Sequence, residues 1–206
     1  MTRDIENNVH ASRKLLRPEV TSLKSYRLAR YSTVTKLDQN ENGFGPPEPV
    51  RRALMDASDQ SPLHRYPDLE ATELREALGR LFDWPSDGIL VGNGSNELLL
   101  TLAMAALEKG RTAMAPSPSF STYAHVSRLM GSDLVEIPAD ENLAHRSEPF
   151  AAAIEKHRPA LVFLCTPNNP TGSAMSPSEV QVVAESCGCI VVVDEAYQEF
   201  SGWSAR

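Results

Sequence analysis

Two apolar patterns alternate along most of the chain. Leucines recur at helical spacing over residues 69–82, which predicts an amphipathic helix. Residues 160–165 and 189–193 are short runs that are apolar throughout, as is typical of strands buried on both faces. The same two patterns predict helices at 19–30, 49–57, 69–82, 97–109, 120–130, 149–157 and 177–186, and strands at 89–91, 112–115, 134–137, 160–165 and 189–193.

This alternation indicates an α/β fold with a mainly parallel sheet covered by helices on both faces. Before it come a polar, weakly periodic arm and a loop dense in turn formers, so we divide the chain into 1–45 and a larger domain at 46–206. Ligands of such sheets bind beyond the carboxyl ends of the strands. The residues of interest are therefore those that follow Val91, Ala115, Cys165 and Val193.

Composition narrows the class of protein. The 206 residues are 41% hydrophobic and 23% charged, as in ordinary globular proteins. The net charge of -7 argues against nucleic acid and anionic membrane surfaces as partners. No apolar run approaches the roughly 20 residues of a membrane helix, and the polar N-terminus lacks a secretory signal. The cysteines, Cys165, Cys187 and Cys189, are expected to be free thiols in a reducing cytoplasm.

A glycine-rich turn follows the strand predicted at 89–91. Gly94, Ser95 and Asn96 open the next helix, where free main-chain N–H groups bind phosphate. Glu97 stands where a dinucleotide fingerprint needs glycine, and no P-loop lysine follows. The turn is equally consistent with a simple helix start capped by Ser95.

An aromatic residue follows the strand predicted at 112–115. Tyr123 lies in the first turn of the next predicted helix, near the carboxyl edge of the sheet. Its ring face would stack on a flat heteroaromatic ligand. The pattern also fits a half-buried core tyrosine.

A rigid loop, residues 166–172, follows the strand predicted at 160–165. It contains two prolines and a glycine, and Asn169 precedes Pro170, which favours an extended backbone at Asn169. The Asn169 amide would then donate to a ligand oxygen, although a turn that caps the next segment also fits.

An acidic residue directly follows the last predicted strand. Asp194 directly follows three valines, and a buried carboxylate there needs a cationic or hydrogen-bonding partner. A helix cap is an alternative, whereas a metal site is disfavoured because no histidine cluster accompanies Asp194. A phosphate cradle, a stacking ring, an amide donor and a buried acid together suit pyridoxal 5'-phosphate, whose protonated ring draws electrons from a substrate carbanion.

Several strings resemble the fold-type I, pyridoxal-phosphate-dependent aminotransferases of classes I and II. The Asn-Pro-Thr-Gly and Asp-Glu-Ala-Tyr strings carry the family signal, and the Arg-Tyr-Pro-Asp and Asn-Glu-Asn segments resemble its histidinol-phosphate branch. The similar segments are 37–42, 64–68, 91–99, 116–123, 167–172 and 191–200. The resemblance implies a three-layer α/β/α large domain that stops before completion.

The resemblance also implies a role for each matching residue. Gly94, Ser95 and Asn96 would hold the cofactor phosphate through N–H groups, and Tyr123 would stack on the ring. Asn169 and Tyr197 would contact the ring hydroxyl oxygen, and Asp194 the ring nitrogen. In a homodimer, Tyr66 would reach the partner's cofactor phosphate. The residues that would line the substrate pocket are Tyr26 and Asn40.

One part of the family's chemistry is missing from the sequence. The family's cofactor-binding lysine lies downstream of the Asp-Glu-Ala-Tyr string, whereas all five lysines here precede Asp194. The complete protein is expected to transfer an amino group between histidinol phosphate and 2-oxoglutarate in histidine biosynthesis, and this chain alone to be inactive. The alternatives are an aminotransferase for an aromatic amino acid or a related phosphorylated substrate, and a non-catalytic remnant.

Overall fold

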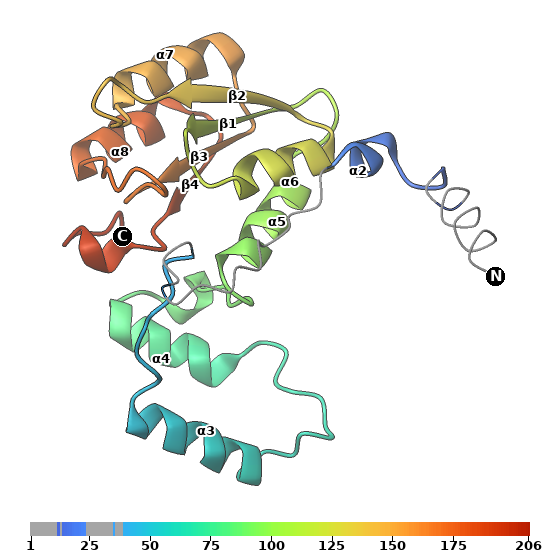
Figure 1. The fold of residues 1–206 in the computed structure, drawn as a ribbon, viewed down its shortest axis with the longest axis vertical. Helices are drawn as coiled ribbons and strands as arrows, with labels where there is room; N and C mark the ends of the chain where they lie inside the picture. The colour runs from blue at the N-terminus through green and yellow to red at the C-terminus, as the bar shows by residue number, and fades with distance from the viewer. Residues whose placement is uncertain (1–11, 13, 24–34, 36–38) are drawn as a thin grey trace. The chain divides into compact units, whose positions relative to one another are not determined.

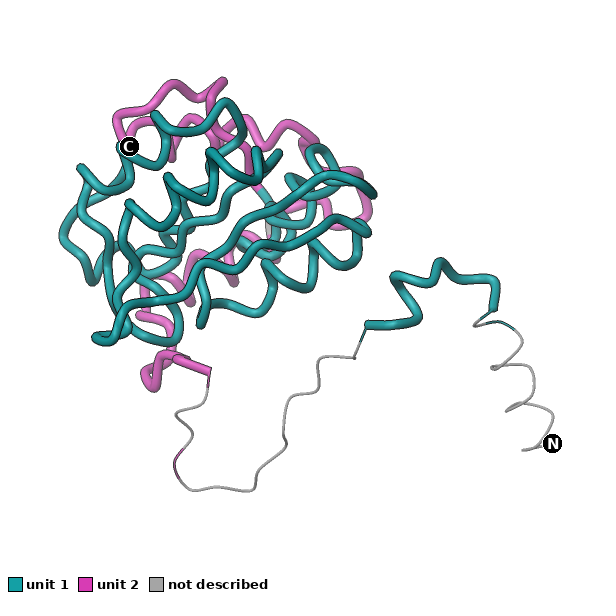
Figure 2. The backbone as a smooth tube through the Cα atoms, turned by 90° about the horizontal axis from the view of Figure 1, so that it is seen from above, with its two compact units in different colours: residues 1–24, 92–206 teal, residues 25–91 magenta. Residues whose placement is uncertain are grey.

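The computed structural model describes residues 12, 14–23, 35 and 39–206. These residues form two compact units (Figure 2), one made of residues 92–206 with the N-terminal segment up to 24, the other of residues 25–91. The boundaries differ from the division at 45 and 46, which concerned function and stays a prediction.

A four-stranded sheet forms the centre of the first unit (Figure 1). Its strands are β1 (Thr112–Ser117), β2 (Asp133–Pro138), β3 (Leu161–Cys165) and β4 (Ile190–Asp194), in the order β2-β1-β3-β4. All neighbouring strands run parallel. Cys165 pairs with Asp194 in the register of β3 and β4, so these two strands end side by side at one edge of the sheet.

Helices cover both faces of this sheet and bury alternate strand residues. Phe163 packs with α5 (Ser95–Ala106) and α6 (Thr122–Met130) on one face. On the other face, Val162 and Leu164 pack with α7 (Ser147–His157) and α8 (Pro177–Ser186). The short helix α2 (Pro18–Ser22) lies beside α6, where Arg17 Nη2 donates to the Leu129 carbonyl over 3.0 Å. The expected three-layer α/β/α arrangement with a parallel sheet is confirmed.

Local sequence signals explain where several helices begin and end. Ser176 and Glu179 cap the start of α8 reciprocally, and Pro177 occupies its first turn, so α8 has the predicted bounds. Gly131 ends α6 in a left-handed conformation with φ of 72°.

The second unit contains α3 (Glu48–Gln60), α4 (Thr72–Phe82) and the short 3-10 helix η1 (Ser86–Gly88). The carboxylate of Asp68 accepts the main-chain N–H of Thr72 over 2.7 Å and that of Glu70 over 3.0 Å. These bonds lower the pKa of Asp68 and fix the start of α4. No residue of α4 is buried within the described chain.

Three sequence-based expectations are wrong or only partly met. Residues 89–91 form no strand, since none of the described strands pairs with this three-residue run and Leu90 is exposed. The helix expected at 19–30 is observed as α2, and residues 24–30 lie outside the described part. Cys187 and Cys189 are not free thiols but a disulfide, because the turn at Gly188 brings their Cα atoms within 5.1 Å. Cys165 is free and buried, as expected.

A membrane-spanning segment was not expected. Among the described residues, no helix combines the length and apolar character needed to cross a membrane.

Candidate functional site at the carboxyl edge of the sheet

Asp194 is the buried acid of this edge, with only 8% of its surface exposed. Its Oδ2 accepts the Tyr123 hydroxyl over 2.7 Å, and its Oδ1 accepts the main-chain N–H of Ala196 over 3.1 Å. The hydrogen-bonding partner that a buried carboxylate requires is therefore Tyr123. Each carboxylate oxygen has a further lone pair, so Asp194 retains capacity for another donor.

Tyr123 lies beneath the edge rather than in the open. Its ring stacks on Phe163 with centroids 4.9 Å apart, and only 1% of its surface is exposed. Burial, followed by proximity to Cys165 and Asp194, raises the pKa of its hydroxyl, which stays protonated and donates to Asp194. This is the core tyrosine that the sequence pattern also allowed. The stacking role remains a prediction, and the half-buried ring next to it is Phe120, whose centroid is 5.9 Å away.

The loop after β3 presents two asparagines with different surroundings. Asn168 is 2% exposed and makes several side-chain hydrogen bonds. Asn169 is half-buried, and its side-chain amide has no hydrogen bond within the described part of the chain. A half-buried amide without a partner is available to a ligand. Sequence reasoning found Asn169 but missed Asn168, because neighbouring identical residues give no sign of which one turns inward.

The N-terminus of α5 offers unpaired donors at the same edge. The main-chain N–H groups of Ser95 and Asn96 have no acceptor among the described residues. The N–H of Gly94, in contrast, donates to the Gly92 carbonyl over 2.9 Å. It is therefore not free, although the sequence predicted that it would be. A side chain at Gly94 would meet no atom within 4 Å, which leaves open space beside these donors. Free N–H groups at a helix start suit an anion.

Contacts between side chains join these segments. The Thr122 hydroxyl donates to the Asn96 side-chain oxygen over 3.3 Å, which links the starts of α5 and α6. Tyr123 then links α6 to Asp194, and Ser119 links the loop after β1 to Asn168 over 2.6 Å. The structure thus brings together the four segments that were predicted to surround one site.

Four further residues were predicted to contribute to the site. Tyr197 is half-buried at the start of the 3-10 helix η2 (Gln198–Phe200), and no hydrogen bond of its hydroxyl is found within the described chain. Tyr66 and Asn40 belong to the second unit and are exposed, with φ of 51° at Asn40. Tyr26 lies outside the described residues.

The carboxyl edge of the sheet offers hydrogen-bond donors and one buried acid, Asp194. Burial raises the pKa of the Cys165 thiol, which therefore stays neutral beneath Tyr123 and Asp194. In the described ranges, no group of three or more histidine, cysteine, aspartate or glutamate side chains is placed to hold a metal ion. The arrangement can receive a phosphate at α5 and a polar aromatic ring near Asp194.

Comparisons with known proteins agree with this description. The family model "Aminotransferase class I and II" matches residues 32–205. Histidinol-phosphate aminotransferase of Caldanaerobacter subterraneus subsp. tengcongensis is 38% identical over 188 residues, covering 91% of this chain and 54% of that protein. Its counterpart from Chlorobium luteolum is 35% identical, over 96% of this chain and 55% of its own length. The chain thus spans about half the length of these relatives.

A solved structure gives the same picture. Histidinol-phosphate aminotransferase from Sinorhizobium meliloti, in complex with pyridoxal-5'-phosphate, superposes with a TM-score of 0.73 and 29% identity. The match covers 78% of this chain and 44% of that one.

Proposed function

Because the chain belongs to the class I and II aminotransferases, we propose that it forms the cofactor-binding part of a histidinol-phosphate aminotransferase. The complete enzyme would move an amino group between histidinol phosphate and 2-oxoglutarate, in the cytoplasm and within histidine biosynthesis. The names of the relatives support this substrate. The observation that carries the proposal is the buried Asp194, held by the Tyr123 hydroxyl at the carboxyl end of β4. The residue before Tyr123, Thr122, is bonded in turn to Asn96 at the start of α5.

The family's cofactor, pyridoxal 5'-phosphate, fits the donors and acceptors of this edge. The N–H groups of Ser95 and Asn96 lack acceptors, the Asn169 amide lacks a partner, and Asp194 has lone pairs to spare. A phosphate, a ring hydroxyl and a protonated ring nitrogen are the three groups that such residues bind. When bound, the cofactor supplies an electron sink for a substrate carbanion.

Asp194 has the central role in this proposal. Its carboxylate, oriented by the Tyr123 hydroxyl and the Ala196 N–H, would hold a proton on the ring nitrogen. Tyr123 acts through Asp194, which fits its burial better than direct stacking does. Phe120 is the neighbouring half-buried ring and is available to contact the cofactor face.

The remaining roles follow the family pattern. Ser95 and Asn96 would bind the phosphate with main-chain N–H groups, with Gly94 leaving space for it. Asn169 and Tyr197 would donate to the ring hydroxyl oxygen. In a homodimer, Tyr66 would contact the phosphate held by the partner, and Tyr26 and Asn40 would line the pocket for the amino donor and the 2-oxo acid.

A second candidate function is binding without turnover. All five lysines precede Asp194, namely Lys14, Lys24, Lys36, Lys109 and Lys156. A lysine in this family attaches the cofactor and moves the substrate proton. We therefore propose that the 206 residues alone bind the cofactor without covalent attachment and do not turn over.

The test combines binding with mapping. The purified chain is incubated with pyridoxal 5'-phosphate, reduced with borohydride and digested for mass spectrometry. Saturable binding without a stoichiometric lysine adduct supports the proposal. A single stoichiometric adduct together with glutamate-dependent turnover contradicts the non-covalent part, and no saturable binding contradicts the cofactor site itself.

A further inference from the structure

We infer that Asn168 is a positioning residue that sets the Asn169 amide for a ligand oxygen. This inference rests on the proposed function, because Asn169 has a ligand only if the edge binds the cofactor. It adds a residue to which no role was given from the sequence.

Asn168 uses both ends of its side-chain amide inside the protein. Its Nδ2 donates to the Pro118 carbonyl over 3.0 Å and to Oγ1 of Thr171 over 2.9 Å. Its Oδ1 accepts the Ser119 hydroxyl over 2.6 Å. One buried side chain thereby ties the loop after β3 to the loop after β1.

The hydrogen bonds also fix which way the amide faces. The Ser119 hydroxyl is bonded to the oxygen end, so the two N–H groups of the amide face Pro118 and Thr171. A carboxylate of the same size would still accept the Ser119 hydroxyl, but it would place a second acceptor against the Pro118 carbonyl oxygen. The site therefore requires an amide rather than any polar side chain.

The backbone at Asn168 is held as firmly as its side chain. Its N–H donates to the Ser173 carbonyl over 2.7 Å, and its carbonyl accepts the Gly172 N–H over 2.7 Å. These bonds close a tight loop around residues 169–172. Asn169 is the first residue of that loop, and its own amide is the part left without a partner in the described chain.

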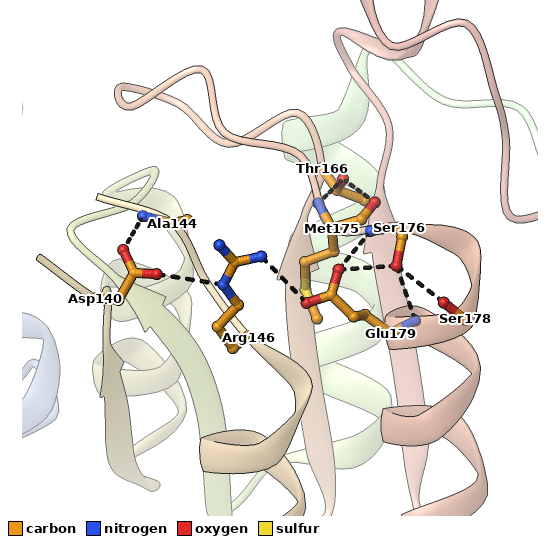
Figure 3. A network of polar contacts seen from close by, with 8 residues as sticks. All are labelled: Asp140, Ala144, Arg146, Thr166, Met175, Ser176, Ser178 and Glu179. Atoms are coloured by element: carbon orange, nitrogen blue, oxygen red, sulfur yellow. Dashed lines mark hydrogen bonds and ion pairs between the residues drawn. The ribbon is translucent and has the colours of Figure 1, made fainter. Parts of the chain in front are cut away.

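The segment 166–175, which contains this loop, has a separate anchor at its base (Figure 3). The Met175 N–H donates to Oγ1 of Thr166 over 3.0 Å, which closes the loop at its base. Beyond it, Glu179 accepts the Ser176 N–H over 2.9 Å and pairs with Arg146 at 3.7 Å. Burial raises the pKa of Glu179, but the hydrogen bonds from Ser176 and the positive charge of Arg146 outweigh this effect. The pKa of Glu179 is therefore lowered, and its carboxylate stays ionised between Ser176 and Arg146.

The two anchors have separate consequences for binding. The Glu179 contacts hold the segment after this loop to the starts of α7 and α8. Asn168 instead holds the start of the loop to Pro118 and Ser119, directly before Phe120. Loss of the Asn168 amide would release Asn169 and leave the donors at Ser95 and Asn96 in place. The expected effect is therefore specific for one group of the ligand.

The experiment compares two probes, pyridoxamine 5'-phosphate and its analogue without the ring hydroxyl, 3-deoxypyridoxamine 5'-phosphate. Neither has an aldehyde that would react with lysines. Dissociation constants are measured by fluorescence for the full chain and for Asn169→Ala, Asn168→Ala, Asn168→Asp and Ser119→Ala. The control is Asn142→Ala, which changes an exposed asparagine in another loop.

We expect wild type to prefer the hydroxylated probe by about tenfold, the value of one good hydrogen bond. Asn169→Ala and both Asn168 variants should remove this preference while the affinity for the deoxy probe stays within about twofold. Ser119→Ala should reduce the preference in part, and Asn142→Ala should leave it unchanged.

Two results from the Asn168 variants would overturn the inference. If the Asn168 variants weaken both probes equally, or keep the full preference, Asn168 does not position Asn169. If the Asn168 variants do not fold, Ser119→Ala provides the test. Equal weakening of both probes, or an unchanged preference, in that variant would overturn the inference. If wild type binds neither probe, the proposed function fails, and this inference fails with it.

Discussion

The Tyr123 hydroxyl donates to Oδ2 of Asp194 over 2.7 Å, across 71 residues of sequence. The bond joins the first turn of α6 to the last residue of β4. It gives a buried carboxylate the partner that its burial demands, and it explains why a tyrosine with 1% exposure lies at the edge of the candidate site.

Removing this donor should cost stability. Tyr123→Phe leaves a buried carboxylate oxygen without its partner, so we expect the free energy of unfolding to fall by about 1–3 kcal/mol. Urea denaturation followed by circular dichroism measures this loss. Tyr197→Phe is the matched control, because the Tyr197 hydroxyl has no hydrogen bond in the described chain and should cost little.

The same bond predicts a dependence on alkaline pH. Burial raises the pKa of Tyr123 above its ordinary value near 10, so the unfolded chain loses the proton first as the pH rises. Stability from Tyr123 is complete below that value and declines above it, by up to about 1.4 kcal/mol per pH unit. Between about pH 10 and 11 wild type should therefore lose stability more steeply than Tyr123→Phe; equal slopes would contradict the burial of a protonated hydroxyl.

A buried histidine predicts a loss of stability at acidic pH. His145 is 4% exposed, with no hydrogen-bond partner for either ring nitrogen within the described residues. Burial lowers its pKa, and the nearby Pro118 carbonyl and Asp140 only partly oppose this. The unfolded state takes up the proton first, so stability falls as the pH drops below about 6.5. From about pH 7.5 to 5.5, His145→Leu should lose about 1 kcal/mol less than wild type in urea unfolding.

The proposed phosphate donors at the start of α5 are main-chain groups, and a pair of substitutions can separate their effect from that of the Ser95 side chain. Ser95 is the first residue of α5, where proline is well tolerated. Ser95→Ala should weaken pyridoxamine 5'-phosphate binding mildly, whereas Ser95→Pro, which lacks the N–H, should weaken it by about tenfold. Equal effects of the two changes in a fluorescence titration would argue against the main-chain cradle.

Asp194 should be the most sensitive position for the cofactor ring. Asp194→Asn keeps the size and replaces an anion with an amide, so a protonated ring nitrogen loses its counter-charge. We expect the affinity for pyridoxamine 5'-phosphate to fall by about tenfold or more. In a complete enzyme, the variant should lose about a few kcal/mol of transition-state stabilisation, and turnover should fall accordingly. Near-normal turnover of that variant would remove Asp194 from the account.

Much of the first unit follows from sequence pattern. The run at 160–165 is apolar on both faces and becomes the fully buried β3, and the Ser-Pro-x-Glu signal places the start of α8 correctly. The position of Asp194 at a strand end also follows from the sequence, because Asp194 directly follows three valines. The observed pairing of Asp194 with Cys165 agrees with it.

Other features depend on partners that are distant in sequence. Residues 89–91 have the composition of a strand but find no partner among the described strands. Tyr123 meets Asp194 only through the packing of α6 on the sheet, so its pattern did not distinguish a stacking ring from a core tyrosine. Asn168 is buried and bonded, whereas Asn169 is half-buried and unpartnered in the described chain. This difference arises from the contacts of Asn168 with Ser119 and Pro118, which no local sequence signal predicts.

We expect the cofactor phosphate to bind the free N–H groups at the start of α5, and its ring to contact Asn169 and Asp194. Amide chemical shifts of the labelled chain during titration with pyridoxamine 5'-phosphate report this binding residue by residue. The main-chain signals of Ser95 and Asn96 and the side-chain signal of Asn169 should shift together with a single dissociation constant, and Asn142 should not respond. Saturable shifts confined to other residues, with these three signals unmoved, would contradict the account.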